Sequence, residues 1–250
     1  MAMSRKISGN RTAEDVLREY HRKLAENKNK VTAPKPKQIA PVKAANITNP
    51  EDYIVLPGRT HGNYSYLDLL VSNEKMHLGK SWYDAHKELQ KNNEFMLTIR
   101  QFVDYLNLLK SGNAYDGAGN KVPKPELIKI YDGITEVKDP WRAEWLDAYF
   151  ENRNNEQYIL TENKAKAEKL QPCLMEDKTP GINLEYWLKN ATPQGFPPKN
   201  IPDGKLYFWH PREDAVAGFN ANSVRAYLGC VSEPQDSNSA LGVRRAKKRV

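Results

Sequence analysis

The sequence has little cysteine, no long apolar run and no export signal at its start. Two cysteines among 250 residues, Cys173 and Cys230, cannot form a disulfide framework or a four-ligand zinc site. We interpret both as reduced, buried small side chains. No apolar run approaches the roughly 18 residues that a membrane-spanning helix needs, so no membrane span is expected. Polar residues follow the basic residues 1–8, where a secretory signal has its apolar stretch, so export by that route is not expected.

Motifs of common catalytic sites are also missing. The chain contains no phosphate-binding loop, dinucleotide fingerprint, H-E-x-x-H or G-x-S-x-G motif. Its five histidines lie in separate segments without metal-ligand spacing, so neither a metal nor another cofactor is expected. Glu144 and Asp147 are three residues apart on an expected helix and could face a common solvent, but no second pair supports acid–base chemistry. The sequence therefore does not predict an enzyme, and a hydrolase that uses Glu144 or Asp147 is the weakest alternative.

Positive charge is concentrated at the two ends of the chain. The formal net charge is +7, yet residues 1–50 alone carry +7 and residues 244–249 add +5, which leaves residues 51–243 at −5. A phosphate-binding groove across the domain is therefore disfavoured, and nucleic acid is not the expected partner. The rival hypothesis is a nucleic-acid-associated protein that binds through its basic termini.

Composition divides the chain into three parts. Residues 1–50 combine an amphipathic helix over residues 12–26 with a Pro/Lys-rich linker. We expect residues 51–246 to form the main domain and residues 247–250 to form a basic tail. The first part is either a flexible arm or an anchor to a larger assembly.

Capping signals predict several helices in the middle of the main domain. Ser81 and Asn183 can each cap a helix, and Thr98 with Gln101 forms a capping-box pattern that opens a helix ending at Gly112. Residues 113–125 resemble a turn-rich loop. The Asp-Pro pair at residues 139–140 is expected to open a further helix, whose apolar face would hold Trp141, Trp145, Ala148 and Tyr149.

Short strands are expected toward both ends of the domain. Apolar runs bounded by turn residues predict strands at residues 53–56 and 205–210, an apolar patch at 64–71 and a short closing strand at 241–243. Helices in the first two thirds followed by short irregular strands predict an α+β fold rather than a doubly wound sheet.

Residues 215–243 have a composition unlike the rest of the chain. No lysine occurs between Lys205 and Lys247. Small apolar residues alternate with other types, which predicts an inward framework and an exposed face. The framework includes Val216, Phe219, Ala221, Ala226, Leu228 and Cys230. The interspersed residues include types that antibody loops favour at contacts, and they are Gly218, Asn220, Asn222, Val224, Arg225, Tyr227, Gly229, Val231, Ser232, Asp236 and Asn238.

Three short segments carry a resemblance to a known family. Phe208-Trp209, Ala226-Tyr227-Leu228 and the sequence Ser-Ala-Leu-Gly-Val-Arg at residues 239–244 resemble the closing region of the C-type lectin fold in its formylglycine-generating-enzyme-like branch. Val243 departs from the usual Phe. More specifically, the chain resembles the variable proteins of diversity-generating retroelements, particularly those of archaea and their viruses. The resemblance implies helices packed on short irregular antiparallel strands.

The resemblance also implies a function for residues 215–243. In that family, template adenines are randomised, so an Asn codon can become Tyr, Ser, Asp, Gly, Arg, Val or Cys but never Lys, Glu, Gln, Met or Trp. All eleven interspersed residues belong to the permitted set, whereas Glu233 and Gln235 do not and are expected to be fixed. The expected protein is a non-catalytic, hypervariable receptor-recognition protein with Tyr227 and Arg225 as affinity anchors.

The expected partner is a protein or cell-surface ligand of a host or neighbouring cell. The first fifty residues would join a larger viral or surface assembly, and the location implied is virion-associated or cytoplasmic.

Two activities of related proteins fit these residues poorly. Formylglycine-generating enzymes need a cysteine pair in their C-terminal region, and only Cys230 is there. Calcium-dependent lectins use a Glu-Pro-Asn or Gln-Pro-Asp triplet together with Trp-Asn-Asp. The triplet at residues 233–235 is Glu-Pro-Gln and the second motif is absent, so calcium is not expected to be required.

Overall fold

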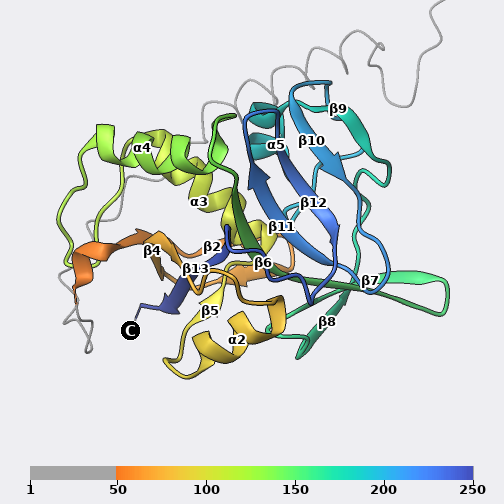
Figure 1. Ribbon diagram of the computed structural model, residues 1–250, viewed down its shortest axis with the longest axis horizontal. Coiled ribbons are helices and arrows are strands. Elements are labelled where there is room, and N and C mark those ends of the chain that lie inside the picture. The colour runs from red at the N-terminus through yellow and green to blue at the C-terminus, as the bar shows by residue number, and fades with distance from the viewer. Residues whose placement is uncertain (1–48, 250) are drawn as a thin grey trace, which may run out of the picture. The chain divides into compact units, whose positions relative to one another are not determined.

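The computed structural model describes residues 49–249 (Figure 1). The helix expected over residues 12–26, and the linker up to residue 48, lie outside the described residues. After a 3-10 turn at Pro50–Asp52, the elements of the first half are β1 (Tyr53–Leu56), β2 (Arg59–His61), β3 (Tyr64–Tyr66), β4 (Leu69–Met76), α2 (Trp82–Gln90), β5 (Phe95–Met96), α3 (Ile99–Ser111) and α4 (Lys124–Thr135). Those of the second half are β6 (Arg142–Arg153), β7 (Glu156–Thr161), β8 (Lys166–Lys169), β9 (Lys178–Ile182), α5 (Leu184–Asn190), β10 (Leu206–Trp209), β11 (Val216–Ala221), β12 (Ala226–Ser232) and β13 (Leu241–Lys248).

One large sheet organises the described chain. Its main path is β1-β4-β13-β6-β11-β12-β10-β9, with β5 paired to β13, and β7 paired to β6 and β8. Within residues 49–249, only the β10–β12 and β13–β6 strand pairs are parallel. Four α-helices in this part of the chain and a mostly antiparallel sheet make the fold α+β, as predicted.

Helices pack on both faces of the sheet. On one face lies the larger apolar cluster, where Phe219 of β11 contacts Phe102 of α3 at 5.2 Å and Trp187 of α5 at 6.4 Å between ring centroids. On the other face, α2 buries Trp82 against β6, where the Trp82 indole donates to the Leu146 carbonyl at 2.9 Å. Figure 1 shows α2 on the side of the sheet opposite α3. The central strands are therefore covered twice.

This double cover explains why the helix expected after residues 139–140 is wrong. Residues 142–153 form β6, the longest strand of the described chain. Ala143 and Trp145 face the α2 side, whereas Leu146 and Ala148 face the larger cluster. A strand that is apolar on both faces loses the period of two, and its aromatic residues then matched helical spacing by coincidence.

Local capping signals located three of the four described helices. Ser81 caps α2, Thr98 and Gln101 form the capping box of α3, and Gly112 ends α3 in the left-handed conformation with φ 65°. Asn183 caps α5 through a bond from the Tyr186 amide. These predictions are confirmed, as are the strands at 53–56 and, within a residue, at 205–210.

One helix was missed and one boundary was placed too early. Residues 124–135 form α4, although the turn-rich loop was expected to reach residue 125. The closing strand β13 runs to Lys248, so the expected boundary at residue 246 falls inside it. No helix in residues 49–249 is long and apolar enough to cross a membrane.

Candidate ligand-binding face

The alternation in β11 and β12 separates most of their residues onto two faces, as predicted. Val216 is the exception among the framework residues, because it precedes a register shift and packs in the smaller cluster beside α2. Ala217, Phe219 and Ala221 of β11 join the larger apolar cluster, together with Leu228 and Cys230 of β12. Because successive side chains of a strand point to opposite faces, the intervening residues point away from that cluster. The strands are in register there, with Gly218 opposite Gly229 and Asn220 opposite Tyr227.

Exposure of the candidate residues is less uniform than predicted. Three of them are buried, which corrects the expectation that the whole set is exposed: Gly218, Asn220 and Gly229. Asn220 is only 6% exposed, because β6 and β12 flank it on both sides. Five are half-buried, namely Asn222, Arg225, Tyr227, Val231 and Ser232, and three are exposed, namely Val224, Asp236 and Asn238.

Aromatic residues of β10 and β12 form a continuous surface on this outer side. Trp209 and Tyr227 meet edge to face with ring centroids 4.8 Å apart, and Tyr207 lies 6.0 Å from Trp209. The Arg225 guanidinium lies 5.2 Å from the centroid of Tyr207 and 5.7 Å from that of Trp209, a geometry that favours a cation–π interaction. We call the surface made by Tyr207, Trp209, Arg225 and Tyr227, with the adjoining Gly218 and Gly229, the aromatic face.

Burial also affects the chemistry of the aromatic face. Partial burial raises the pKa of the Tyr227 hydroxyl, while the positive charge of Arg225 acts in the opposite direction. Tyr227 is therefore a neutral phenol at physiological pH, able to donate or accept one hydrogen bond.

Of the two glycines of the aromatic face, Gly229 has room for a side chain and Gly218 is more tightly packed. A Cβ added at Gly229 would lie 3.5 Å from the nearest Tyr227 ring carbon, which is ordinary contact, and one at Gly218 would lie 3.3 Å from the Glu144 carbonyl oxygen. By contrast, a Cβ at Gly242 would lie 2.7 Å from Leu78 Cδ2 and 2.9 Å from the Met76 carbonyl oxygen. The backbone therefore requires glycine at 242 but not at 229.

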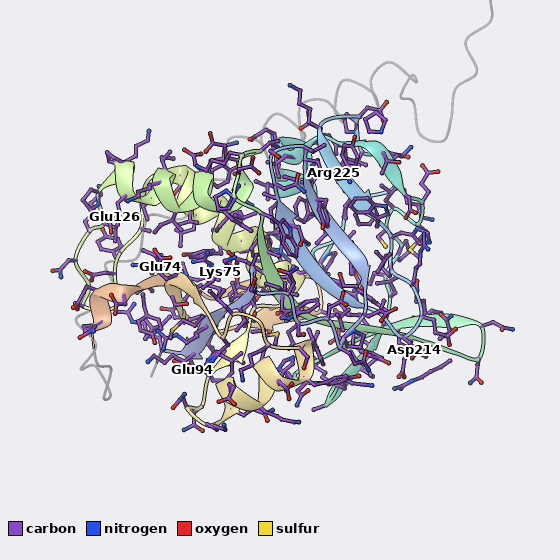
Figure 2. The ribbon with its side chains drawn as sticks, viewed as in Figure 1. Glu74, Lys75, Glu94, Glu126, Asp214 and Arg225 are labelled. Atoms are coloured by element: carbon purple, nitrogen blue, oxygen red, sulfur yellow. The ribbon has the colours of Figure 1, made fainter. Side chains whose placement is uncertain are left out.

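The hairpin tip beside the aromatic face combines a fixed turn with an exposed apolar residue. The Asn222 side-chain carbonyl accepts from the amides of Val224 at 2.8 Å and Arg225 at 2.9 Å, so Asn222 shapes the turn. Val224 is 74% exposed. Figure 2 shows Arg225 at this end of β12.

Asp236 and Asn238 lie in a different place. They belong to the loop after β12, in which the Pro234 carbonyl accepts from the Trp82 amide at the start of α2. Ser232, the last residue of β12, lies seven positions after Arg225, which is about 23 Å of strand at the usual rise. The candidate residues thus fall into two groups: one lies on the aromatic face and its hairpin tip, and the other lies in the loop after β12. The register shift opposite Val231 and Ser232 interrupts the alternation between them.

Sequence reasoning missed two members of the aromatic face. Tyr207 and Trp209 lie in β10, outside residues 215–243, and reach the face because β10 pairs in parallel with β12, with Tyr207 opposite Tyr227. The alternation within residues 205–210 was a usable signal for their direction, but the pairing of the two strands was not readable from either segment alone.

The proposed acid–base pair is not brought together. Glu144 and Asp147 lie on a strand rather than a helix, point to opposite faces and are both buried, which corrects the expectation of a common solvent face. Glu144 holds Arg244 through two bonds, at 2.6 and 3.2 Å. That carboxylate keeps the pKa of Arg244 above its ordinary value despite burial, which alone would lower it. Within residues 49–249, no group of three or more His, Cys, Asp or Glu is placed to hold a metal ion.

Much of the basic end is neutralised within the sheet. Besides Arg244, Arg245 lies 3.6 Å from Glu94 and Arg249 lies 3.9 Å from Asp68. The Lys247 ammonium lies 4.4 Å from the centroid of the Tyr53 ring. Three of the arginines at this end thus have a carboxylate nearby, whereas the Lys248 side chain is exposed.

In comparisons with known proteins, no protein-family model, curated protein or solved structure matches this chain.

Proposed function

We propose that this chain is a non-catalytic ligand-binding protein whose aromatic face and adjoining hairpin tip select a protein or cell-surface ligand. We further propose that the domain has a C-type lectin fold and that a retroelement diversifies residues 215–243. Archaea or their viruses are the proposed setting, with a larger viral or surface assembly as the partner of the first fifty residues.

A single observation carries the proposal. In β11 and β12, five of the six framework residues, Phe219, Ala221, Ala226, Leu228 and Cys230, are buried in the larger cluster. The adenine-accessible residues Gly218, Asn220, Tyr227 and Gly229 alternate with them and lie on the other face of the sheet. Gly229, in the middle of that side, can accept a side chain without a clash. Side chains on such a face can change while the core that stabilises the fold stays the same.

The chemistry of the aromatic face suits binding. Tyrosine, tryptophan and arginine dominate the energetic centres of interfaces, and here Trp209, Tyr227 and Arg225 contact one another in advance. Because these rings are already held, little conformational entropy is lost when a ligand binds. Because the aromatic residues are held rigidly, changes at a few residues beside them are enough to give useful affinity for a ligand.

The rival function, nucleic-acid binding through the termini, has less support from the described end of the chain. Arg244, Arg245 and Arg249 each have a carboxylate nearby. A protein that bound duplex DNA through such an end would lose affinity steeply with salt, so affinity measured across salt concentrations separates the two functions.

The experiment is a pair of display libraries on the full chain. One library randomises Val224, Arg225, Tyr227 and Gly229. The matched control randomises four positions on one side of the β7–β8 hairpin, at Glu156, Tyr158, Ala167 and Lys169. This set also contains a half-buried tyrosine on paired strands.

We expect the first library to yield specific binders to unrelated folded proteins and the control to yield few. Equal yields from both libraries, or binders from the control alone, would place the ligand surface elsewhere and refute the proposal.

A further inference from the structure

A second candidate site lies away from the aromatic face. A cavity of about 460 Å³ is bounded by β3, α2, β5, the start of α3 and the turn after β7. Its walls include Tyr64, Tyr66, His86, Glu94, Asp147 and Asn163. Figure 2 shows Glu94 near α2 and Arg225 at the far end of β12, so the two sites are separate. We call this space the hairpin cavity; its volume lies within the range of about 300–1,000 Å³ for small-molecule sites.

A buried carboxylate of the hairpin cavity has unused hydrogen-bonding capacity. Glu94 is 6% exposed, and its Oε1 accepts from the Tyr53 hydroxyl at 3.2 Å and lies 3.6 Å from Arg245. Its Oε2 is buried and has no hydrogen-bond partner. Buried polar atoms normally have a partner. Because Glu94 lines the cavity, its unpartnered oxygen is the candidate acceptor for a donor supplied by a ligand.

A buried histidine–carboxylate pair lies on the same wall. His86 and Asp147 are each 2% exposed, and Nε2 of His86 is 3.3 Å from Asp147 Oδ1 yet makes no hydrogen bond. Asp147 accepts from the amides of Glu162 at 2.6 Å and Asn163 at 3.4 Å.

The backbone of the adjoining turn is strained. Three consecutive non-glycine residues, Glu162, Asn163 and Lys164, have φ of 55°, 54° and 70°. Such conformations cost free energy and persist where surrounding contacts impose them, often at ligand sites. The turn is held over the cavity by its two bonds to Asp147.

The balance of charged side chains around the hairpin cavity favours a neutral ligand over an anion or a cation. The wall has three carboxylates, of Glu94, Asp147 and Glu162, and two lysines, Lys166 and Lys248, while Arg245 already lies beside Glu94. Because the charges are balanced within the protein, the site offers hydrogen-bonding capacity rather than a net attraction for an anion or a cation.

The cavity walls add a surface for the apolar side of a ligand. The rings of Tyr64 and Tyr66 lie 6.0 Å apart and can pack against C–H groups. Another cavity, of about 450 Å³, lacks this combination, because its buried Glu144 and Arg244 are bonded to each other.

We propose that the hairpin cavity binds a neutral, hydroxyl-rich small molecule of monosaccharide size, whose hydroxyl donates to Glu94 Oε2 while its C–H face packs on Tyr64. The site is metal-free and independent of the aromatic face, so it adds a second binding activity to the chain.

The test is ligand-observed NMR of the full chain with D-glucose, D-galactose, D-mannose and N-acetyl-D-glucosamine. Glu94→Gln replaces the unpartnered oxygen or its neighbour with a donor, and Gln90→Trp fills the cavity from an exposed position of α2. We expect at least one sugar to bind the natural chain, and each variant to bind it at least about tenfold more weakly, the loss that corresponds to roughly one hydrogen bond.

Lys87, which is exposed, and Glu88, which is half-buried, lie on α2 outside the cavity walls and provide controls. Glu88→Gln makes the same change as Glu94→Gln, and Lys87→Trp introduces the same side chain as Gln90→Trp. Both should leave sugar binding unchanged. Three results would overturn the proposal: no binding of any of these sugars, binding that persists in Gln90→Trp, or a preference for the polyamine spermidine that Glu94→Gln abolishes. Because the aromatic face is untouched, these results leave the display experiment unaffected.

Discussion

Replacing glycine by alanine at two positions tests whether the aromatic face tolerates change. Glycine within a strand is destabilising by roughly 0.5–1 kcal/mol relative to alanine, and a Cβ at Gly229 meets its neighbours at 3.5 Å or more. We therefore expect Gly229→Ala to stabilise the protein by about 0.5 kcal/mol. At Gly242 the added Cβ would lie 2.7 Å from Leu78 Cδ2 and 2.9 Å from a backbone oxygen, so overpacking should cost about 1–3 kcal/mol.

The measurement is urea unfolding of both variants beside the natural chain, with the free energy of unfolding taken from linear extrapolation. Both glycines lie in neighbouring parts of one sheet and neither has a positive φ, so local packing is the main difference between them. A loss at Gly229 as large as that at Gly242 would refute the reasoning, because position 229 would then be part of the invariant frame.

Three further predictions follow from burial. Phe219→Ala, in the larger cluster, should lower the free energy of unfolding by about 3–5 kcal/mol. Tyr227→Ala, at a half-buried position of the aromatic face, should lower it by about 1 kcal/mol. Equal losses in urea unfolding would contradict the assignment of the two residues to different faces. Burial raises the pKa of the Cys173 thiol to about 11 and that of Cys230 well above its ordinary value, so both should react slowly with a thiol reagent at neutral pH and fully after unfolding; rapid labelling of the folded chain would show one to be accessible. Burial also raises the pKa of Tyr105 to about 12. The folded protein therefore keeps a proton that the unfolded chain gives up, and its stability should fall as the pH rises above about 10. Below pH 12, the ultraviolet titration of folded Tyr105→Phe should match that of the natural chain, and a natural chain that ionises one more tyrosine than the variant near pH 10 would contradict the prediction.

Elements whose signals lie within one or two turns were predictable from the sequence. The start of α2 at Ser81 and both ends of α3, at Thr98 and Gly112, depend on bonds between residues three or four positions apart. The start of α4 could also have been found, because Leu127 and Ile134 have helical spacing and Pro125 lies in the first turn.

Features that depend on distant parts of the chain were not predictable. Whether β6 is a strand depends on cover from α2 on one face and α3 on the other, and its Glu144 pairs with Arg244, 100 positions later. The alternation of β11 and β12 predicted the direction of each side chain. The depth at which Asn220 lies was set by the neighbouring strands, which no local pattern describes.

Because β13 is close to the end of the sequence, the sheet is complete only when the chain is translated through this strand. This strand lies between β4 and β6 near the middle of the sheet, yet it begins only at Leu241, and most of it follows residues 215–243 in the chain. Any frameshift or premature stop within those residues removes β13 and leaves β4 and β6 with unpaired edges, a state prone to aggregation and degradation. Only copies that are translated in frame through residues 215–243 can therefore complete the sheet.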